Sequence, residues 1–403
     1  MNRKEAQDAM PVKNRIAEMH DEIAGWRRDL HEHPELLYDT HRTAAIVAAK
    51  LREFGCDQVA EGIGRTGVVA LIKGRSDTSD RVVGIRADMD ALPIMEATGL
   101  PYASKTPGLM HACGHDGHTA MLLGAAKYLA ETRNFDGAVA VIFQPAEEGG
   151  AGGKAMVDDG LIDRFRIREI YGMHNSPSLP LGAFAIRPGP FYAATDTFTI
   201  RVIGRGGHAA RPHATVDPTI IASHLVLALQ SIVSRNADPV GSIVVSVTSF
   251  RTSTDAYNVI PETVELRGTV RTFDPELRAR AEARVKAIAV HTGEVYGGRA
   301  EVVWEKGYPA MVNHETETGF AAEAARRVSA TVDPHAPAVM GGEDFAYMLE
   351  ACPGAYIQVG AGEGASLHHP AYDFNDEVIP VGASYWAELI EQRLPVGSSP
   401  TFR

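Results

Sequence analysis

The sequence predicts an α/β fold, with a mixed, largely parallel sheet and helices on both faces in a catalytic domain, and an inserted, smaller α+β domain. Two amphipathic helical stretches within residues 12–54 come first. Short β-branched runs follow at residues 68–72, 82–85, 139–143, 169–173 and, much later, 355–359. A helical stretch at residues 119–130 lies between the second and third runs, and this alternation is typical of a parallel sheet.

The middle of the chain has a different pattern, which predicts the inserted domain. Strands are expected at 198–203, 242–250, 263–272 and 300–304, and helices at 218–235 and 275–295. Their β-α-β-β-α-β order is that of a small ferredoxin-like unit. Both helices follow an Asp-Pro pair, Asp217-Pro218 and Asp274-Pro275, in which Asp caps the helix and Pro fits its first turn. We therefore expect a catalytic domain of residues 1–187 and 308–403 and an inserted domain of residues 188–307.

Composition excludes several classes of protein. Lys plus Arg number 39 and Asp plus Glu 51, a net charge of −12 that argues against binding to nucleic acid. No window reaches the ~18 uninterrupted apolar residues of a membrane span, and residues 1–30 contain no run typical of a signal peptide. Three cysteines are too few for a disulfide framework. We expect a cytoplasmic protein without a membrane partner.

Four of the apolar runs lead to residues that can carry chemistry. In chain order these are Asp88 and Asp90, then Glu147 and Glu148, then His174, and finally His368 and His369 after a Gly-rich loop. Ligands of open α/β sheets bind beyond the carboxyl ends of the strands. The sequence therefore predicts that these side chains meet at one edge of the sheet.

The segment from His111 to His118 places a thiol and three imidazoles in front of a helix. Cys113 and His115 can both face one metal ion if Gly114 lets the backbone turn tightly. The alternative is a Gly-rich loop with capping histidines and an inert thiol. With the carboxylate and the distant histidines, the candidate ligands exceed the four of a closed zinc site, which favours two ions.

The adjacent acids Glu147 and Glu148 could have two different roles at a metal site. One carboxylate would bind metal while the other takes a proton from the attacking water. The alternative is an ordinary solvated pair.

In the inserted domain, a Gly-rich turn at residues 204–213 contains His208 but no phosphate-binding fingerprint. A histidine from a mobile domain could donate a hydrogen bond to an oxyanion.

The motifs resemble those of a known family, the aminoacylase and carboxypeptidase-G-like metallopeptidases, in the branch of hippurate hydrolases and auxin-amino acid amidohydrolases. The resemblance extends from Asp29 to Glu377. The motifs that carry it are Arg86 to Pro93, Cys113 to His118, Gln144 to Gly149, Gly172 to Asn175, Gly207 to Ala210 and Gly341 to Phe345.

The resemblance implies a two-domain amidohydrolase with two divalent ions, Zn, Mn, Co or Ni. The substrates it implies are N-acyl amino acids, such as hippurate, N-acetyl amino acids or indoleacetyl conjugates, which yield a carboxylic acid and a free amino acid. The inserted domain would act as a lid and mediate a homodimer or higher homo-oligomer. The implied ligands are Cys113, His115, Glu148, His174 and His368. Further implied roles are Glu147 as general base, His208 as oxyanion donor, Asn258 as a substrate contact, and Asp88 and Asp90 as residues that orient the imidazoles.

One departure and several alternatives accompany this interpretation. The family commonly has Asn where this chain has His369, so either imidazole could be the ligand, and position favours His368. The early histidines His31, His33 and His41 could also be considered ligands. Other functions that fit are a dipeptidase or carboxypeptidase of the same fold, a non-catalytic metal-binding module, and a thiol hydrolase in which Cys113 pairs with a neighbouring histidine.

Overall fold

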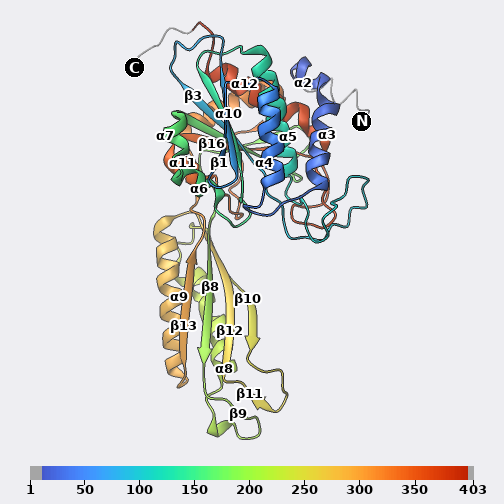
Figure 1. Cartoon of the computed structure of the whole chain (residues 1–403). Helices are drawn as coiled ribbons and strands as arrows, with labels where there is room; N and C mark the ends of the chain where they lie inside the picture. The colour runs from blue at the N-terminus through green and yellow to red at the C-terminus, as the bar shows by residue number, and fades with distance from the viewer. Residues whose placement is uncertain (1–10, 398–403) are drawn as a thin grey trace. The chain divides into compact units, whose positions relative to one another are not determined.

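The structure is a computed structural model that describes residues 11–397 (Figure 1). Residues 1–10 and 398–403 lie outside this range, and with them the start of the segment in which no signal peptide is expected. The chain divides into two compact units. The first runs to Phe191 and includes Val312–Pro337 and the chain from Asp344 onward, and the second comprises Tyr192–Met311 and Ala338–Glu343.

The first unit contains an eight-stranded sheet in the order β1-β2-β4-β3-β5-β16-β6-β15. Its four central strands, β4, β3, β5 and β16, are mutually parallel, and antiparallel strands extend it on both sides. All seven residues of β4 are buried, as expected for a central strand covered on both faces. The strands are β1 (Gln58–Ile63), β2 (Gly67–Lys73), β3 (Val82–Asp88), β4 (Ala138–Gln144), β5 (Ile167–Ser176), β6 (Phe184–Ala185), β15 (Val332–Asp333) and β16 (Gly354–Gly360).

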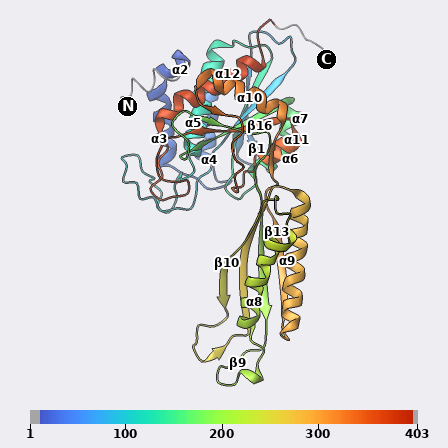
Figure 2. The same cartoon turned by 180° about the vertical axis from the view of Figure 1, so that it is seen from behind.

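Helices cover both faces of this sheet. Helices α3, α5 and α12 lie together on one side, and α6, α7 and α11 lie on the other (Figures 1 and 2). The first unit has the helices α2 (Asn14–Glu18), α3 (His20–Glu32), α4 (His41–Glu53), α5 (His115–Thr132), α6 (Gly152–Asp158), α7 (Leu161–Phe165), α10 (Glu315–Val328), α11 (Ala346–Ala351) and α12 (Ile379–Arg393). Apolar side chains from α5 and α12 join those of the central strands in one core.

The second unit contains a four-stranded antiparallel sheet in the order β10-β12-β8-β13, with two helices packed against it. Burial alternates along β8, as it does when one face of a sheet is covered. Its elements are β8 (Ala194–Ile203), β9 (Gly207–His208), α8 (Pro218–Ser231), β10 (Ile243–Thr252), β11 (Val259–Ile260), β12 (Thr263–Thr272), α9 (Pro275–Val295) and β13 (Arg299–Lys306). The chain enters this unit through β7 (Gly189–Tyr192) and leaves it through β14 (Met311–Asn313).

The predicted fold class is confirmed. Both Asp-Pro helix starts are also confirmed, because Asp217 accepts a hydrogen bond from the Thr219 N–H and Asp274 accepts one from the Leu277 N–H. The helix predicted at 218–235 ends earlier, at Ser231, where a π-helical turn follows. Among residues 11–397, no helix is long and apolar enough to cross a membrane.

Candidate metal centre

The carboxyl ends of the central parallel strands meet at one edge of the sheet. Asp88, the last residue of β3, is in register with Gln144, the last residue of β4. His174 lies near the end of β5 and is in register with Gln358 of β16. Because the strands are parallel and adjacent, the chain segments that follow them emerge side by side.

Gly114 shapes the segment that enters this edge. Its φ of 92° is in the left-handed region, and it precedes His115, the first residue of α5. A Cβ at this position would lie 2.6 Å from Oδ1 of Asn175 and 2.7 Å from the hydroxyl of Tyr372. A side chain would therefore be excluded by both conformation and space, and the glycine brings Cys113 and His115 onto the same site.

The five predicted ligands form two groups of three that share Cys113. In one group, Cys113, His115 and His174 have ligand atoms within 4.8 Å of one another. In the other, Cys113, Glu148 and His368 meet the same limit. The Cys113 Sγ lies 3.4 Å from Nε2 of His174, and Oε1 of Glu148 lies 3.2 Å from Nε2 of His368.

Hydrogen bonds orient two of the imidazoles. Nδ1 of His115 donates to the carbonyl of Asp90 at 2.8 Å, and Nδ1 of His174 donates to the carbonyl of Asn175 at 2.7 Å. This tautomer leaves Nε2 as a lone-pair donor, which is the usual arrangement in histidines that bind metal. Within residues 11–397, the buried Nε2 of His115 has no hydrogen-bond partner. Such an orphaned acceptor fits a bound cation.

The electrostatics of the cluster favour positive charge on His115 and His368, while burial lowers the pKa of His174 well below its usual range. Burial alone would lower the pKa of His115, but the charges of Asp88 and Cys113 outweigh it and raise that pKa well above its usual range. Contacts with Cys113 and then Glu148 raise the pKa of His368 to about 10. A thiolate, imidazoles and a carboxylate together suit Zn and related first-row ions. The residues present therefore fit the predicted pair of divalent ions.

A third group, Asp88, His115 and His118, also meets the distance limit for metal ligands. Both ring nitrogens of His118 are already in hydrogen bonds, however. Nδ1 donates to Oδ1 of Asp88 at 2.6 Å, and Nε2 accepts from the N–H of Asn175 at 3.0 Å. Asp88 thus holds His118, while the imidazole of His115 is held by the Asp90 carbonyl.

The sequence analysis gave a role to Asp88, but it assigned none to the other residues of a buried network behind the site. Arg86 is fully buried and donates to Asp88 at 2.8 Å, to Gln144 at 2.8 Å and to Asp344 at 3.2 Å. Asp344 in turn accepts from Gln144 and from the N–H of Gly153. Arg86, Asp88, Gln144 and Asp344 lie within the motifs quoted above, so the motifs were the signal that could have found them. That their charges are buried and paired with one another could not be read from the sequence.

Other candidate histidines lie apart from the cluster. His369 is exposed, and its Nδ1 accepts from the N–H of Ala371 at 3.0 Å. His31 is buried against Asp116, to which its Nδ1 donates at 2.9 Å. His208 and Asn258 belong to the second unit, where β9 pairs with β11 and the Asn258 carbonyl accepts from the Ala209 N–H.

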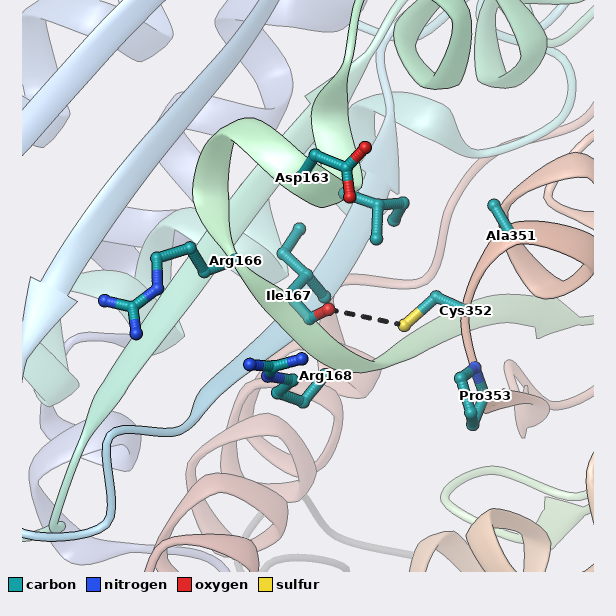
Figure 3. Close-up of a pocket in the computed structure, with 8 residues that line it drawn as sticks. Asp163, Arg166, Ile167, Arg168, Ala351, Cys352 and Pro353 are labelled. Atoms are coloured by element: carbon teal, nitrogen blue, oxygen red, sulfur yellow. Dashed lines mark hydrogen bonds between the residues drawn. The ribbon is translucent and has the colours of Figure 1, made fainter.

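A separate cavity of about 390 Å³ lies at the opposite end of β5, beside Ile167, which begins that strand (Figure 3). Figure 3 shows the thiol of Cys352 directed at the carbonyl of Ile167, 3.8 Å away, and Arg166 directed away from it. Burial raises the pKa of Cys352 to about 12, so this thiol stays protonated. The cavity contains no activated nucleophile and is distinct from the metal cluster.

Comparison with known proteins identifies relatives along nearly the whole chain. The sequence pattern of peptidase family M20/M25/M40 matches residues 84–392. The chain is 42% identical over 377 residues to hippurate hydrolase of Campylobacter jejuni, covering 93% of this chain and 97% of that protein. It is 41% identical over 389 residues to N-acetyl-L-cysteine deacetylase of Bacillus subtilis, covering 96% and 91%.

A solved structure agrees with these relatives. The Bacillus subtilis YXEP protein, described as a dinuclear metal binding peptidase of the M20 family, superposes with a TM-score of 0.81 at 38% identity. The match covers 94% of this chain and 99% of that one. The predicted resemblance is confirmed: this chain belongs to peptidase family M20/M25/M40, in its amidohydrolase branch, and is a metallo-amidohydrolase that acts on amide bonds.

Proposed function

We propose that this enzyme hydrolyses N-acyl amino acids to a carboxylic acid and a free amino acid. The observation that carries the proposal is the position of Glu147. Its carboxylate lies within 4.8 Å of the ligand atoms of His115 and Glu148, at the edge of the cluster. An acid beside a set of metal ligands is what amide hydrolysis by an activated water requires. The names of the relatives, a hippurate hydrolase and an N-acetyl-L-cysteine deacetylase, support this substrate class.

The two groups of three would hold the two ions. Cys113, His115 and His174 would bind one, and Cys113, Glu148 and His368 would bind the other. When bound, the ions polarise the amide carbonyl and lower the pKa of water at the site. Cys113 would belong to both sets, and its thiolate would serve as a ligand rather than as a nucleophile.

Glu147 would move the proton. Its carboxylate takes a proton from water as the water oxygen adds to the amide carbon. The same carboxyl group then gives that proton to the amide nitrogen, and the C–N bond breaks. The products are the acid and an amino acid with a free amino group. Burial of Glu147 limits competing contact with bulk water.

We propose that two residues of the second unit assist. His208 would donate a hydrogen bond to the carbonyl oxygen as it gains negative charge, and Asn258 would contact the substrate. In the pairing of β9 with β11, His208 lies opposite Val259, the residue after Asn258, and His208 is exposed. Each donor of this kind is worth about 3 kcal/mol of transition-state stabilisation.

The test is release of free amino acid from a panel of substrates by the metal-reconstituted protein. The panel contains hippurate, N-acetyl amino acids, indoleacetyl conjugates and, as competitors, simple dipeptides. We expect hydrolysis of N-acyl amino acids, and a Glu147→Gln variant that binds two ions but turns over about 10²–10⁴-fold more slowly. Comparable turnover by that variant would remove Glu147 from its role.

The same panel separates the alternatives. Preference for dipeptides would indicate a peptidase of this fold, and complete inactivity of a fully loaded protein would indicate a metal-binding module. A thiol hydrolase would survive chelation, whereas we expect chelator treatment to abolish turnover and added metal to restore it.

We also propose that the chain assembles as a homodimer, or a higher homo-oligomer, through the second unit. Ile220 and Leu227, two turns apart on one face of α8, are 50% and 70% exposed. An apolar patch exposed on one face of a helix marks an interaction surface. Sedimentation of the intact protein and of Leu227→Glu tests this, because we expect the variant to sediment as a smaller assembly than the wild type.

A further inference from the structure

The carboxylate of Asp90 is buried and contacts the main chain of both acids at the centre. Its Oδ1 accepts from the N–H of Glu147 and its Oδ2 from the N–H of Glu148, each at 3.0 Å. An ionised carboxylate has two acceptor oxygens and no donor, so each oxygen can receive one of two consecutive N–H groups, whereas an amide side chain offers one oxygen beside an NH₂ donor. Hydrogen bonds to an ionised acceptor are also the stronger kind.

The turn that these bonds hold is strained. Ala146, directly before Glu147, has a φ of 55°, which side chains other than glycine rarely adopt. Its N–H donates to the carbonyl of Leu37 at 3.1 Å, and its own carbonyl accepts from the N–H of Gly152 at 3.0 Å. The turn therefore persists because surrounding hydrogen bonds hold it, and Asp90 supplies two of them.

Asp90 is itself held in place by its neighbours in the chain. The N–H of Met89 donates to the carbonyl of Gln144 at 2.8 Å, and the N–H of Ala91 donates to the carbonyl of Glu35 at 2.8 Å. The Asp90 carbonyl accepts Nδ1–H of His115. One anchored residue thus contacts the proposed general base, one acidic ligand and one imidazole ligand.

We propose that Asp90 is a positioning residue that sets the carboxylates of Glu147 and Glu148 through their backbone N–H groups. Its role extends beyond orienting an imidazole, because its side chain acts on the acidic pair. The inference rests on the proposed function for its effect on turnover, although the backbone contacts do not depend on it.

The first experiment is a double-variant cycle with Asp90→Asn and Glu147→Gln. Asn at position 90 retains one acceptor and turns its NH₂ group toward the other N–H. We expect kcat to fall about 100-fold, with two ions still bound and KM little changed. Because Asp90 acts in large part through Glu147, Asp90→Asn should lower kcat much less in the Glu147→Gln background than in the wild-type background. A residue that is merely structural would lower kcat equally in both backgrounds.

The second experiment needs no substrate. In amide hydrogen exchange, the N–H groups of Glu147 and Glu148 should exchange at least about tenfold faster in Asp90→Asn, because their acceptor is lost. Exchange along β4 should not change. If Asp90→Asn fails to fold, Asp90→Glu keeps both acceptor oxygens but moves them by one methylene group, and the same two readouts apply.

Asp274→Asn is the control. Asp274 also accepts a backbone N–H, that of Leu277 at 2.7 Å, at the start of α9. We expect this variant to speed exchange at the start of α9 while kcat stays at the wild-type level.

Two results would overturn the inference: unchanged exchange at Glu147 and Glu148 in Asp90→Asn, or a fall in kcat that multiplies with that of Glu147→Gln. Failure of the proposed function is recognised separately, by a wild-type protein inactive on the whole substrate panel. In that case the exchange experiment still decides whether Asp90 holds the pair.

Discussion

The sulfur of Cys113 lies 3.4 Å from Nε2 of His174, although 61 positions separate the two residues in the chain. Cys113 belongs to both groups of candidate ligands, so its sulfur is the atom that the two groups have in common. Burial raises the pKa of this thiol, and a bound cation is what would hold it as a thiolate.

Replacement of Cys113 should therefore weaken both metal sites at once. For Cys113→Ala we expect fewer than two bound ions by elemental analysis and a kcat/KM about 10³-fold lower on an N-acyl amino acid. Cys56→Ala is the control, because Cys56 is only partly buried and belongs to neither group. Retention of two tightly bound ions in Cys113→Ala would contradict the shared role.

The two adjacent histidines His368 and His369 should differ sharply. His368 has Nε2 3.2 Å from Glu148, and its backbone is held in the left-handed region by a bond from its N–H to the carbonyl of Ala112. The His369 ring accepts from Ala371 instead. We expect His368→Ala to lose one ion and His369→Ala to keep both. The reverse pattern in metal titrations would assign the ligand to His369.

Stability should depend on the pH through His31. Burial would lower its pKa, but the hydrogen bonds to Asp116 and Glu96 and the charge of Asp116 together outweigh burial and raise the pKa from 6.5 to about 9. Folding thus favours protonated His31, so the stabilisation is fully present below about pH 6.5 and is lost as the pH rises through about 9. The expected loss is on the order of 3 kcal/mol.

Urea unfolding monitored between pH 6 and 10 measures this loss. In His31→Gln, the free energy of unfolding should change much less with pH over that range. His33→Gln is the control, because the His33 ring contacts the carbonyl of Asp29. An unchanged pH dependence in His31→Gln would show that other groups account for it.

Removal of the buried Arg86 should be costly. In Arg86→Met, Asp88 and Asp344 would lose their cationic partner in a fully buried site, for which we expect a loss of about 3–5 kcal/mol in the free energy of unfolding. Arg15→Met removes an ion pair with Glu131 whose arginine side chain is 44% exposed, and should cost less than about 1 kcal/mol. Equal losses in the two variants would show that the buried network does not stabilise the fold.

Much of the fold could be predicted because its signals are local. The apolar runs, their alternation with helical stretches and the Asp-Pro helix starts depend on residues that are neighbours in the chain. The residues that follow several of the strands could likewise be named as candidate site residues. Helices α10 and α12 were not predicted, and α11 is a short helix that begins two residues after Asp344.

The sequence by itself determined the strand and helix pattern and the chemical types available at the strand ends, since periodicity and capping act over a few residues. Only the tertiary structure decided that Cys113 belongs to two groups of candidate ligands, that Asp90 accepts from the N–H groups of Glu147 and Glu148, and that Arg86 bridges Asp88 and Asp344. These contacts depend on the order in which the strands pair, and that order brings together segments far apart in the chain.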